Sequence, residues 1–180
     1  MVNSNDSNSA LNKVLASETG QFPSDSVPAY TLEQSPSEMF FELTDYLREQ
    51  FAINKGVLVV KRDNAKLSAI SMWNNGFRQD GLTLNLPKKE SLFEKVLESG
   101  CLHAEFIRGT FDGNFFERKL LLDDHTLSFA LKPLILDGKV IGLIGFSSEK
   151  LTSFTQLDEG ESVELLDDFA EKLHRGKTTV

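Results

Sequence analysis

The sequence of 180 residues has few of the residues that several classes of protein require. It contains one cysteine, Cys101, which excludes an intrachain disulfide framework and a zinc site built from cysteines alone. It has no run of 18 uncharged apolar residues, and residues 1–20 are rich in Ser and Asn without an apolar stretch. Neither a membrane span nor a signal peptide is therefore predicted, and the cytoplasm is the expected location.

Positive charge is also scarce. The chain has 19 Lys and Arg against 27 Asp and Glu, which gives a formal net charge of −8 at pH 7. Binding to the phosphate backbone of nucleic acids is therefore disfavoured, and no nucleic-acid partner is expected. The length and the 40% hydrophobic content predict one domain with a sizeable core.

The N-terminal 34 residues combine repeated serines and two prolines with only scattered apolar residues. Such a stretch buries too little apolar surface to offset an ordering cost of about 1–2 kcal/mol per residue. We therefore predict a disordered tail over residues 1–34 that contributes nothing to the fold. The ordered domain is expected over residues 35–175, followed by a disordered end over residues 176–180.

Three amphipathic helices are predicted, each with a recognisable beginning or end. The first starts at a capping box, Ser35-Pro36-Ser37-Glu38. The second ends at Ser99-Gly100, as at a helix C-cap. The third has acidic residues early and basic residues late, which suits the helix dipole. The expected ranges are residues 35–52, 91–100 and 158–173, with Gly176 closing the last helix.

Several strands are predicted between these helices. Asp137-Gly138 is the strongest hairpin signal, because a type I′ turn needs positive φ angles that Gly and Asp tolerate. Asn74-Asn75-Gly76 is expected to break a strand, and Gly109–Leu122 is expected to be an irregular, Phe-rich segment. The expected strands are residues 57–61, 67–73, 82–86, 102–107, 127–136 and 139–147. The fold class is therefore α+β, with a central antiparallel sheet of five or six strands flanked by helices.

Three stretches of the chain carry a further pattern. They are the run Lys139-Val140-Ile141-Gly142-Leu143-Ile144 in the last predicted strand, Phe154-Thr155 followed by the apolar residues of the last helix, and the stretch Glu94–Cys101. Through these stretches residues 35–173 resemble a GAF domain, a small-molecule sensory module related to PAS domains. The first is similar to the G-x-x-I-G-x-L run in the last central strand of that family, and the second resembles the family's Phe-Thr turn and terminal helix. The third resembles the helix that leads to the strand beside the family's pocket.

The resemblance implies that the first and last helices cover one face of the sheet. The connecting helix and loops would then enclose a pocket on the other face. It also implies a noncatalytic sensory or regulatory domain in signal transduction that binds a small molecule or a protein partner, with no cofactor. An interaction or scaffold domain, whose pocket is filled by its own phenylalanines and takes no ligand, is the alternative.

The chain contains only one of the two parts of the signature that marks GAF domains that bind cyclic nucleotides. Phe154, Asp158 and Glu159 match the F-x-x-x-D-E part of the signature of cyclic-nucleotide GAF domains. Ser147–Lys150 stands where the Asn-Lys part would lie, so cyclic-nucleotide binding is not expected. The alternative interpretation is an acidic first turn of the last helix, with Lys150 pairing with Asp158.

Catalytic and metal chemistry find little support in the residues. The three-cysteine set of GAF-type methionine sulfoxide reductases cannot be assembled from Cys101 alone, and we interpret this residue as a free structural cysteine rather than a reactive thiol. Strand alternation places His103 and Glu105 on one face, but no further ligands accompany them, so no metal site is predicted. The chain has no nucleophile elbow or kinase signature, and we expect no enzyme activity.

The candidate ligand site is the segment Cys101–Phe116, with Trp73 opposite. Apolar walls with a few polar anchors are typical of small-molecule sites, and Gly109 and Gly113 allow close backbone approach. A loop held in the core by its phenylalanines is the alternative interpretation. The candidate ligand-binding residues are Trp73, Phe77, Cys101, His103, Phe106, Arg108, Phe111, Asp112 and Phe115.

A homodimer through the first and last helices is also predicted. Leu165 and Phe169 widen the apolar stripe of the last helix beyond what one sheet contact needs, and Phe40 and Phe41 do the same in the first helix.

Overall fold

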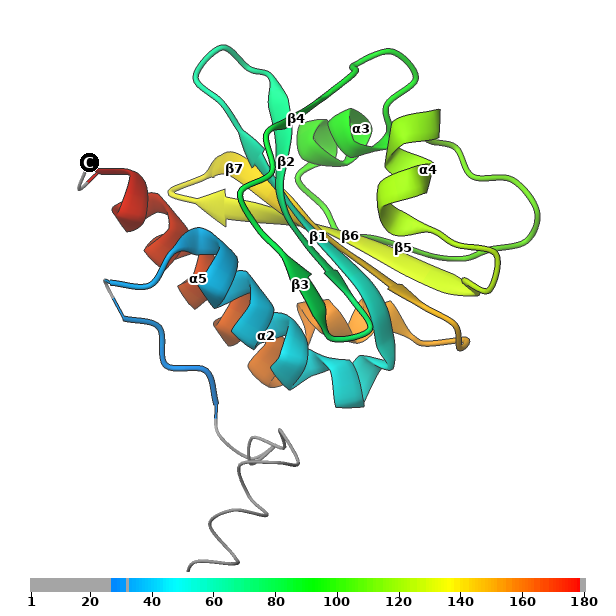
Figure 1. Cartoon of the computed structure of the whole chain (residues 1–180), viewed down its shortest axis with the longest axis horizontal. Coiled ribbons are helices and arrows are strands. Elements are labelled where there is room, and N and C mark those ends of the chain that lie inside the picture. Colours follow the sequence, from blue (N-terminus) through cyan, green and yellow to red (C-terminus); the bar gives the residue numbers. More distant parts are fainter. Residues whose placement is uncertain (1–26, 32, 179–180) are drawn as a thin grey trace, which may run out of the picture.

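The computed structural model describes residues 27–31 and 33–178. The described residues form a seven-stranded antiparallel sheet with helices on both faces (Figure 1). The strand order is β3-β2-β1-β7-β6-β5, and β4 also pairs with β2. The strands are β1 (Ile53–Lys61), β2 (Leu67–Asn74), β3 (Phe77–Gln79), β4 (Leu84–Leu86), β5 (His103–Phe106), β6 (Ser128–Leu136) and β7 (Lys139–Ser148).

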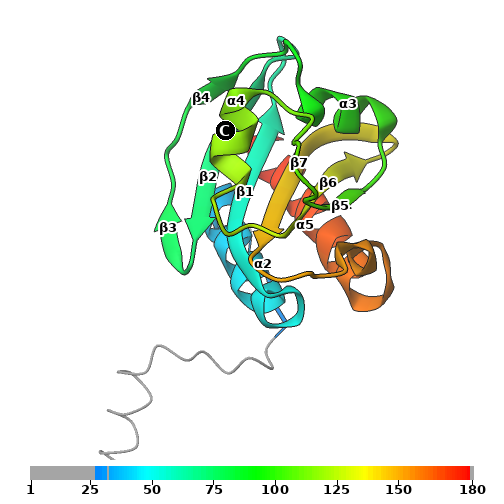
Figure 2. The same cartoon turned by 90° about the vertical axis from the view of Figure 1, so that its right-hand side faces the viewer.

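Two long helices cover one face of the sheet. They are α2 (Pro36–Phe51) and α5 (Gly160–Thr178), which lie side by side in Figure 1, with the 3-10 helix η1 (Phe154–Asp158) leading into α5. The other face carries α3 (Leu92–Ser99) and α4 (Phe115–Leu121); in Figure 2, α4 lies in front of the sheet and α2 and α5 lie behind it. This two-sided arrangement of the helices is the one that the resemblance implied.

The predicted local signals are largely confirmed. Ser35 and Glu38 form the expected capping box at the start of α2. Asp137 and Gly138 have φ angles of 50° and 74°, as a type I′ hairpin requires, and they join β6 to β7. These elements were predictable because each depends on a few neighbouring residues.

Several predictions of element boundaries are wrong. The strand predicted over residues 57–61 begins earlier, because β1 starts at Ile53 and includes Gly56. Gly176 does not end the last helix, since α5 continues to Thr178. The predicted break at Asn74-Asn75-Gly76 is confirmed, because β2 ends at Asn74, but Asn75 and Gly76 have positive φ angles and form a hairpin turn into β3, a strand that was not predicted. The Phe-rich segment is not irregular throughout, because it contains α4.

The predicted tail lies mostly outside the described residues, but Tyr30 is an exception. Its side chain is 7% exposed and its ring packs edge-on against Phe169, with 5.9 Å between ring centroids. The expectation that nothing before Ser35 contributes to the fold is therefore wrong at this residue. The Tyr30 hydroxyl has no hydrogen-bond partner among the described residues. Burial, followed by the nearby carboxylates of Asp168 and Glu42, raises the pKa of this phenol above its ordinary value.

Candidate functional site

The sheet face beneath α3 and α4 is where the resemblance places a pocket, and here it is filled. A cluster of buried hydrophobic side chains from the sheet packs against side chains of α3 and α4. Phe93 and Leu121 are fully buried in this cluster, and the partly buried Phe111 packs on it, edge-on to Phe129 at a centroid distance of 5.5 Å. The interior of this face is therefore protein core.

Glu117 of α4 joins the two helices that cover this face. Its side chain is 0% exposed, and its carboxylate accepts hydrogen bonds from the backbone N–H groups of Leu92 and Phe93 at 2.8 and 3.0 Å. The Ser91 hydroxyl donates a third bond at 2.6 Å, and the backbone N–H of Asn114 donates a fourth at 3.2 Å. No ion pair of the described residues includes Glu117. The charge is instead stabilised by the N-terminal end of α3, where free N–H groups and the helix dipole favour an anion.

The sequence prediction missed this arrangement, although a signal for part of it was present. Asn114 is the N-cap of α4, its side chain accepts a bond from the Glu117 N–H at 3.0 Å, and Glu117 bonds back to the Asn114 N–H. The spacing Asn114-x-x-Glu117 is that of a capping box, which marks a helix start. The second role of Glu117, on α3, depends on residues more than 20 positions away and has no local signature.

The predicted site residues do not form one site. Trp73 is 1% exposed and lies on the α2 face of the sheet, in the core shared with α2 and α5, whereas Phe111 packs on the opposite face. The expected position of Trp73 opposite the Cys101–Phe116 segment is therefore wrong. Its indole Nε1–H donates to Asp45 at 3.0 Å, and Asp45 also pairs with Arg78.

A β-bulge explains where Trp73 points. Leu58 pairs with Ser71 and Val59 pairs with Ala69, so Ile70 is an extra residue in β2. Strict alternation from Ala69 would place Trp73 on the α3 and α4 face, but the extra residue reverses the alternation beyond it.

Most of the other candidate residues lie at the surface. Phe77 begins β3 at the sheet edge and is 71% exposed, and Cys101 is exposed and free. His103 and Glu105 of β5 share a face as predicted, with Nε2 and Oε2 2.9 Å apart. The remaining candidates, Phe106, Arg108, Asp112 and Phe115, are exposed.

No group of three or more His, Cys, Asp or Glu side chains within residues 27–31 and 33–178 is placed to hold a metal ion. Within the same residues, no helix is both long and apolar enough to span a bilayer.

Asp158 makes a different ion pair from the one predicted. It pairs with Lys132, so the predicted pairing with Lys150 is wrong.

The comparisons with known proteins show the fold through structural similarity and give no match by sequence. No protein-family model matches the sequence, and no curated protein sequence matches it. Among solved structures, the GAF domain of a two-component sensor histidine kinase from Bacillus halodurans is similar with a TM-score of 0.63 and 16% identity, over 81% of this chain and 97% of that chain. The GAF domain/HD domain protein from Geobacter sulfurreducens has a TM-score of 0.62 and 15% identity, over 83% and 99% of the two chains.

An enzyme shares the same architecture. Type II free methionine-R-sulfoxide reductase from Thermoplasma acidophilum is similar with a TM-score of 0.60 and 18% identity, over 80% of this chain and 96% of that chain. At identities this low, the structural similarity shows the fold alone. The α+β topology, the placement of the helices on the two faces and these structural matches agree, and the chain has a GAF fold.

Proposed function

We propose that this chain is a noncatalytic regulatory domain that recognises a protein partner on its surface instead of holding a small molecule in its interior. The observation that carries this proposal is the filled face beneath α3 and α4, where hydrophobic side chains and the buried Glu117 occupy the space that a ligand would need. The proposal is the alternative that the resemblance allowed, a GAF-type domain whose own phenylalanines close the pocket.

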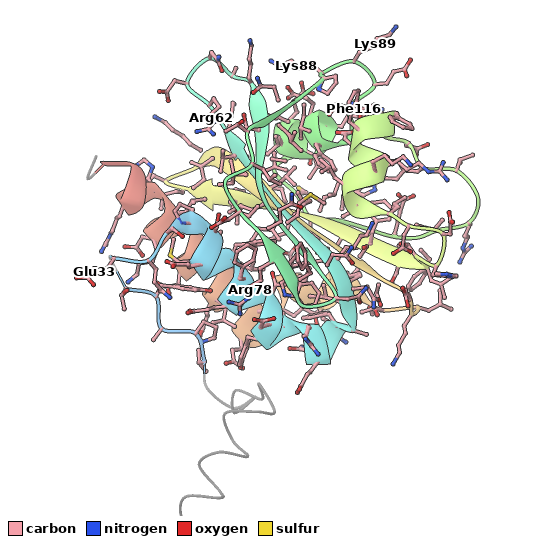
Figure 3. All side chains as sticks on the ribbon, viewed as in Figure 1. Glu33, Arg62, Arg78, Lys88, Lys89 and Phe116 are labelled. Carbon is pink, nitrogen blue, oxygen red and sulfur yellow. The ribbon has the colours of Figure 1, made fainter. Side chains whose placement is uncertain are left out.

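The surface of α4 supports partner binding. Phe115 and Phe116 are 66% and 54% exposed and lie edge to face, with 5.9 Å between their ring centroids. Figure 3 labels Phe116 on α4 below Lys88 and Lys89, and the Asn114 side chain at the start of α4 donates to the carbonyl of Lys89 at 3.3 Å. Exposed aromatic side chains are typical anchors of protein interfaces.

Two further observations bear on the rest of the proposal. The single cysteine of the chain, Cys101, is exposed and has no second cysteine within the chain to form a disulfide with, which argues against a catalytic cycle that forms an intrachain disulfide. The side chains that suggested a homodimer through the first and last helices, Phe40, Phe41, Leu165 and Phe169, are buried within the monomer, so they do not support that interface. Homodimerisation and the cytoplasmic location stay predictions.

Native mass spectrometry of the full chain purified from its host tests the proposal directly. We expect the mass of the polypeptide alone, because the interior is occupied by protein. A small molecule retained in stoichiometric amount would contradict the proposal and favour a sensory domain that binds a small molecule.

A matched pair of variants tests whether Phe111 fills the interior. Phe111→Ala should lower the free energy of unfolding by about 2–3 kcal/mol, somewhat less than for a fully buried ring, because the ring packs on the core cluster. Phe116→Ala, at an exposed ring of the same segment, should change it by less than about 0.5 kcal/mol. Equal stability of the two variants in urea denaturation would show that the space around Phe111 is not packed core.

A further inference from the structure

A shallow hollow of about 270 Å³ lies outside the surface discussed so far. It forms where the C-terminal end of α2, the start of β1, the turn between β2 and β3, and the residues after β7 come together. Trp73 lines it, which places the hollow beside the core of the α2 and α5 face. It is therefore separate from the filled face beneath α3 and α4.

Two cations, Arg48 and Lys150, line this hollow. The Arg48 guanidinium lies 5.8 Å from the centroid of the Trp73 ring, and a Cβ added to Gly76 would lie 3.9 Å from its Nη1 atom. The guanidinium therefore lies next to both the ring and the turn. Among the described residues, no ion pair includes Arg48 or Lys150. In a chain with a net charge of −8, two such cations on one hollow are available to an anionic ligand.

The wall of the hollow is held in place by hydrogen bonds between three segments. The Asn54 side chain donates to the Asn75 side chain at 3.1 Å, and the Asn75 N–H donates to the Asn54 carbonyl at 2.8 Å. The Glu149 N–H donates to the Asn54 side-chain oxygen at 2.6 Å. These bonds tie the start of β1 to the β2–β3 turn and to the end of β7, so the hollow exists before any ligand arrives.

Two features oppose an anion at this place and limit its affinity. Glu149 also lines the hollow, and the carbonyl end of the α2 dipole lies beside it. Arg48, in the last turn of α2, offsets the helix end with a full positive charge. We therefore expect weak binding, in the millimolar range, of a small ligand.

We propose that this hollow is a binding site for a small oxyanion, a carboxylate or a phosphate group, held between Arg48 and Lys150. Both cations donate hydrogen bonds to oxyanions, and the planar guanidinium can bind two oxygens at once. The proposal concerns a different part of the molecule from the proposed partner surface on α4 and is independent of it.

The single tryptophan provides the measurement, because Trp73 lines the hollow and lies beneath the guanidinium. The full chain is titrated with inorganic phosphate, and separately with acetate, at constant ionic strength, while the fluorescence of Trp73 is recorded. A saturable change with one of the two supports the site and distinguishes phosphate from carboxylate. The absence of a saturable change with both overturns the proposal.

Charge variants give the proposal a signature that a general loss of structure would not produce. Arg48→Gln and Lys150→Gln should each raise the dissociation constant about five- to tenfold. Glu149→Gln should lower it about two- to fivefold, because the variant removes a repulsive charge. Arg62→Gln, in the exposed β1–β2 turn labelled in Figure 3, is the matched control and should leave it unchanged.

A second measurement is needed if Arg48→Gln alters the fluorescence of the Trp73 ring directly. The side-chain amide resonances of Asn54 and Asn75 in nuclear magnetic resonance spectra then report the same titration without the tryptophan. Equal dissociation constants for the unmodified chain, Lys150→Gln and Glu149→Gln would mean nonspecific anion binding and would refute the site.

Discussion

Glu117 offers the sharpest test of how the two helices above the sheet are held together. Its buried carboxylate accepts four hydrogen bonds, three of them from the start of α3 and one from its own helix. Glu117→Ala would leave these donors without a partner in a site that water does not reach. Breaking a buried charged network by removing one member costs about 3–5 kcal/mol, so we expect a loss of this size in the free energy of unfolding.

Glu117→Gln separates the charge from the shape of the side chain. The amide keeps one oxygen that can accept hydrogen bonds, but its NH₂ group faces donors where the second carboxylate oxygen stood. We expect a loss of about 2–3 kcal/mol, intermediate between Glu117→Ala and the unmodified chain. Glu98→Gln, at an exposed carboxylate on α3, is the control and should change stability by less than about 0.5 kcal/mol.

Urea denaturation at neutral pH, followed by circular dichroism, measures these differences, and hydrogen exchange locates them. The amides of Leu92 and Phe93 should lose protection in Glu117→Ala, because their acceptor is gone. A loss below about 1 kcal/mol in Glu117→Ala, or unchanged protection of these amides, would refute the role assigned to the carboxylate.

Three further predictions follow from single residues. Tyr30→Phe should retain or slightly raise stability at pH 7, because it removes a buried hydroxyl without a partner among the described residues. Above about pH 10 the unmodified chain should lose stability relative to the variant, because the Tyr30 phenol releases its proton in the unfolded state but not in the folded state. Equal pH profiles of stability for the two chains would disprove this. Gly142→Ala should destabilise severely, because its Cβ would lie 2.4 Å from the Val59 carbonyl oxygen, and thermal melting at the temperature of the unmodified chain would contradict this. Gly176→Ala should raise the free energy of unfolding by up to about 1 kcal/mol, because a Cβ there meets no neighbouring atom and alanine favours a helix more than glycine does. A lowered melting temperature would count against the continuation of α5 past this residue.

Local signals in the sequence determined much of the fold. The capping box at Ser35 and Glu38 and the turn at Asp137-Gly138 each depend on a few adjacent residues, and both form as predicted. The same logic applies to Asn114 and Glu117, whose spacing indicates a helix start that the sequence analysis overlooked. The helices and hairpins, and through them the α+β class, were therefore within reach of the sequence.

Only the tertiary structure decided which residues come together. The extra residue Ile70 in β2 turns Trp73 toward α2. This bulge arises from the register in which β1 pairs with β2, and the sequence of neither strand reveals that register alone. The hydrogen bonds that Glu117 accepts from the start of α3 likewise join segments distant along the chain, as does the hollow that Arg48 and Lys150 both line. Such contacts depend on register and on the packing of whole elements, and these are set by the global minimum of free energy rather than by local preference.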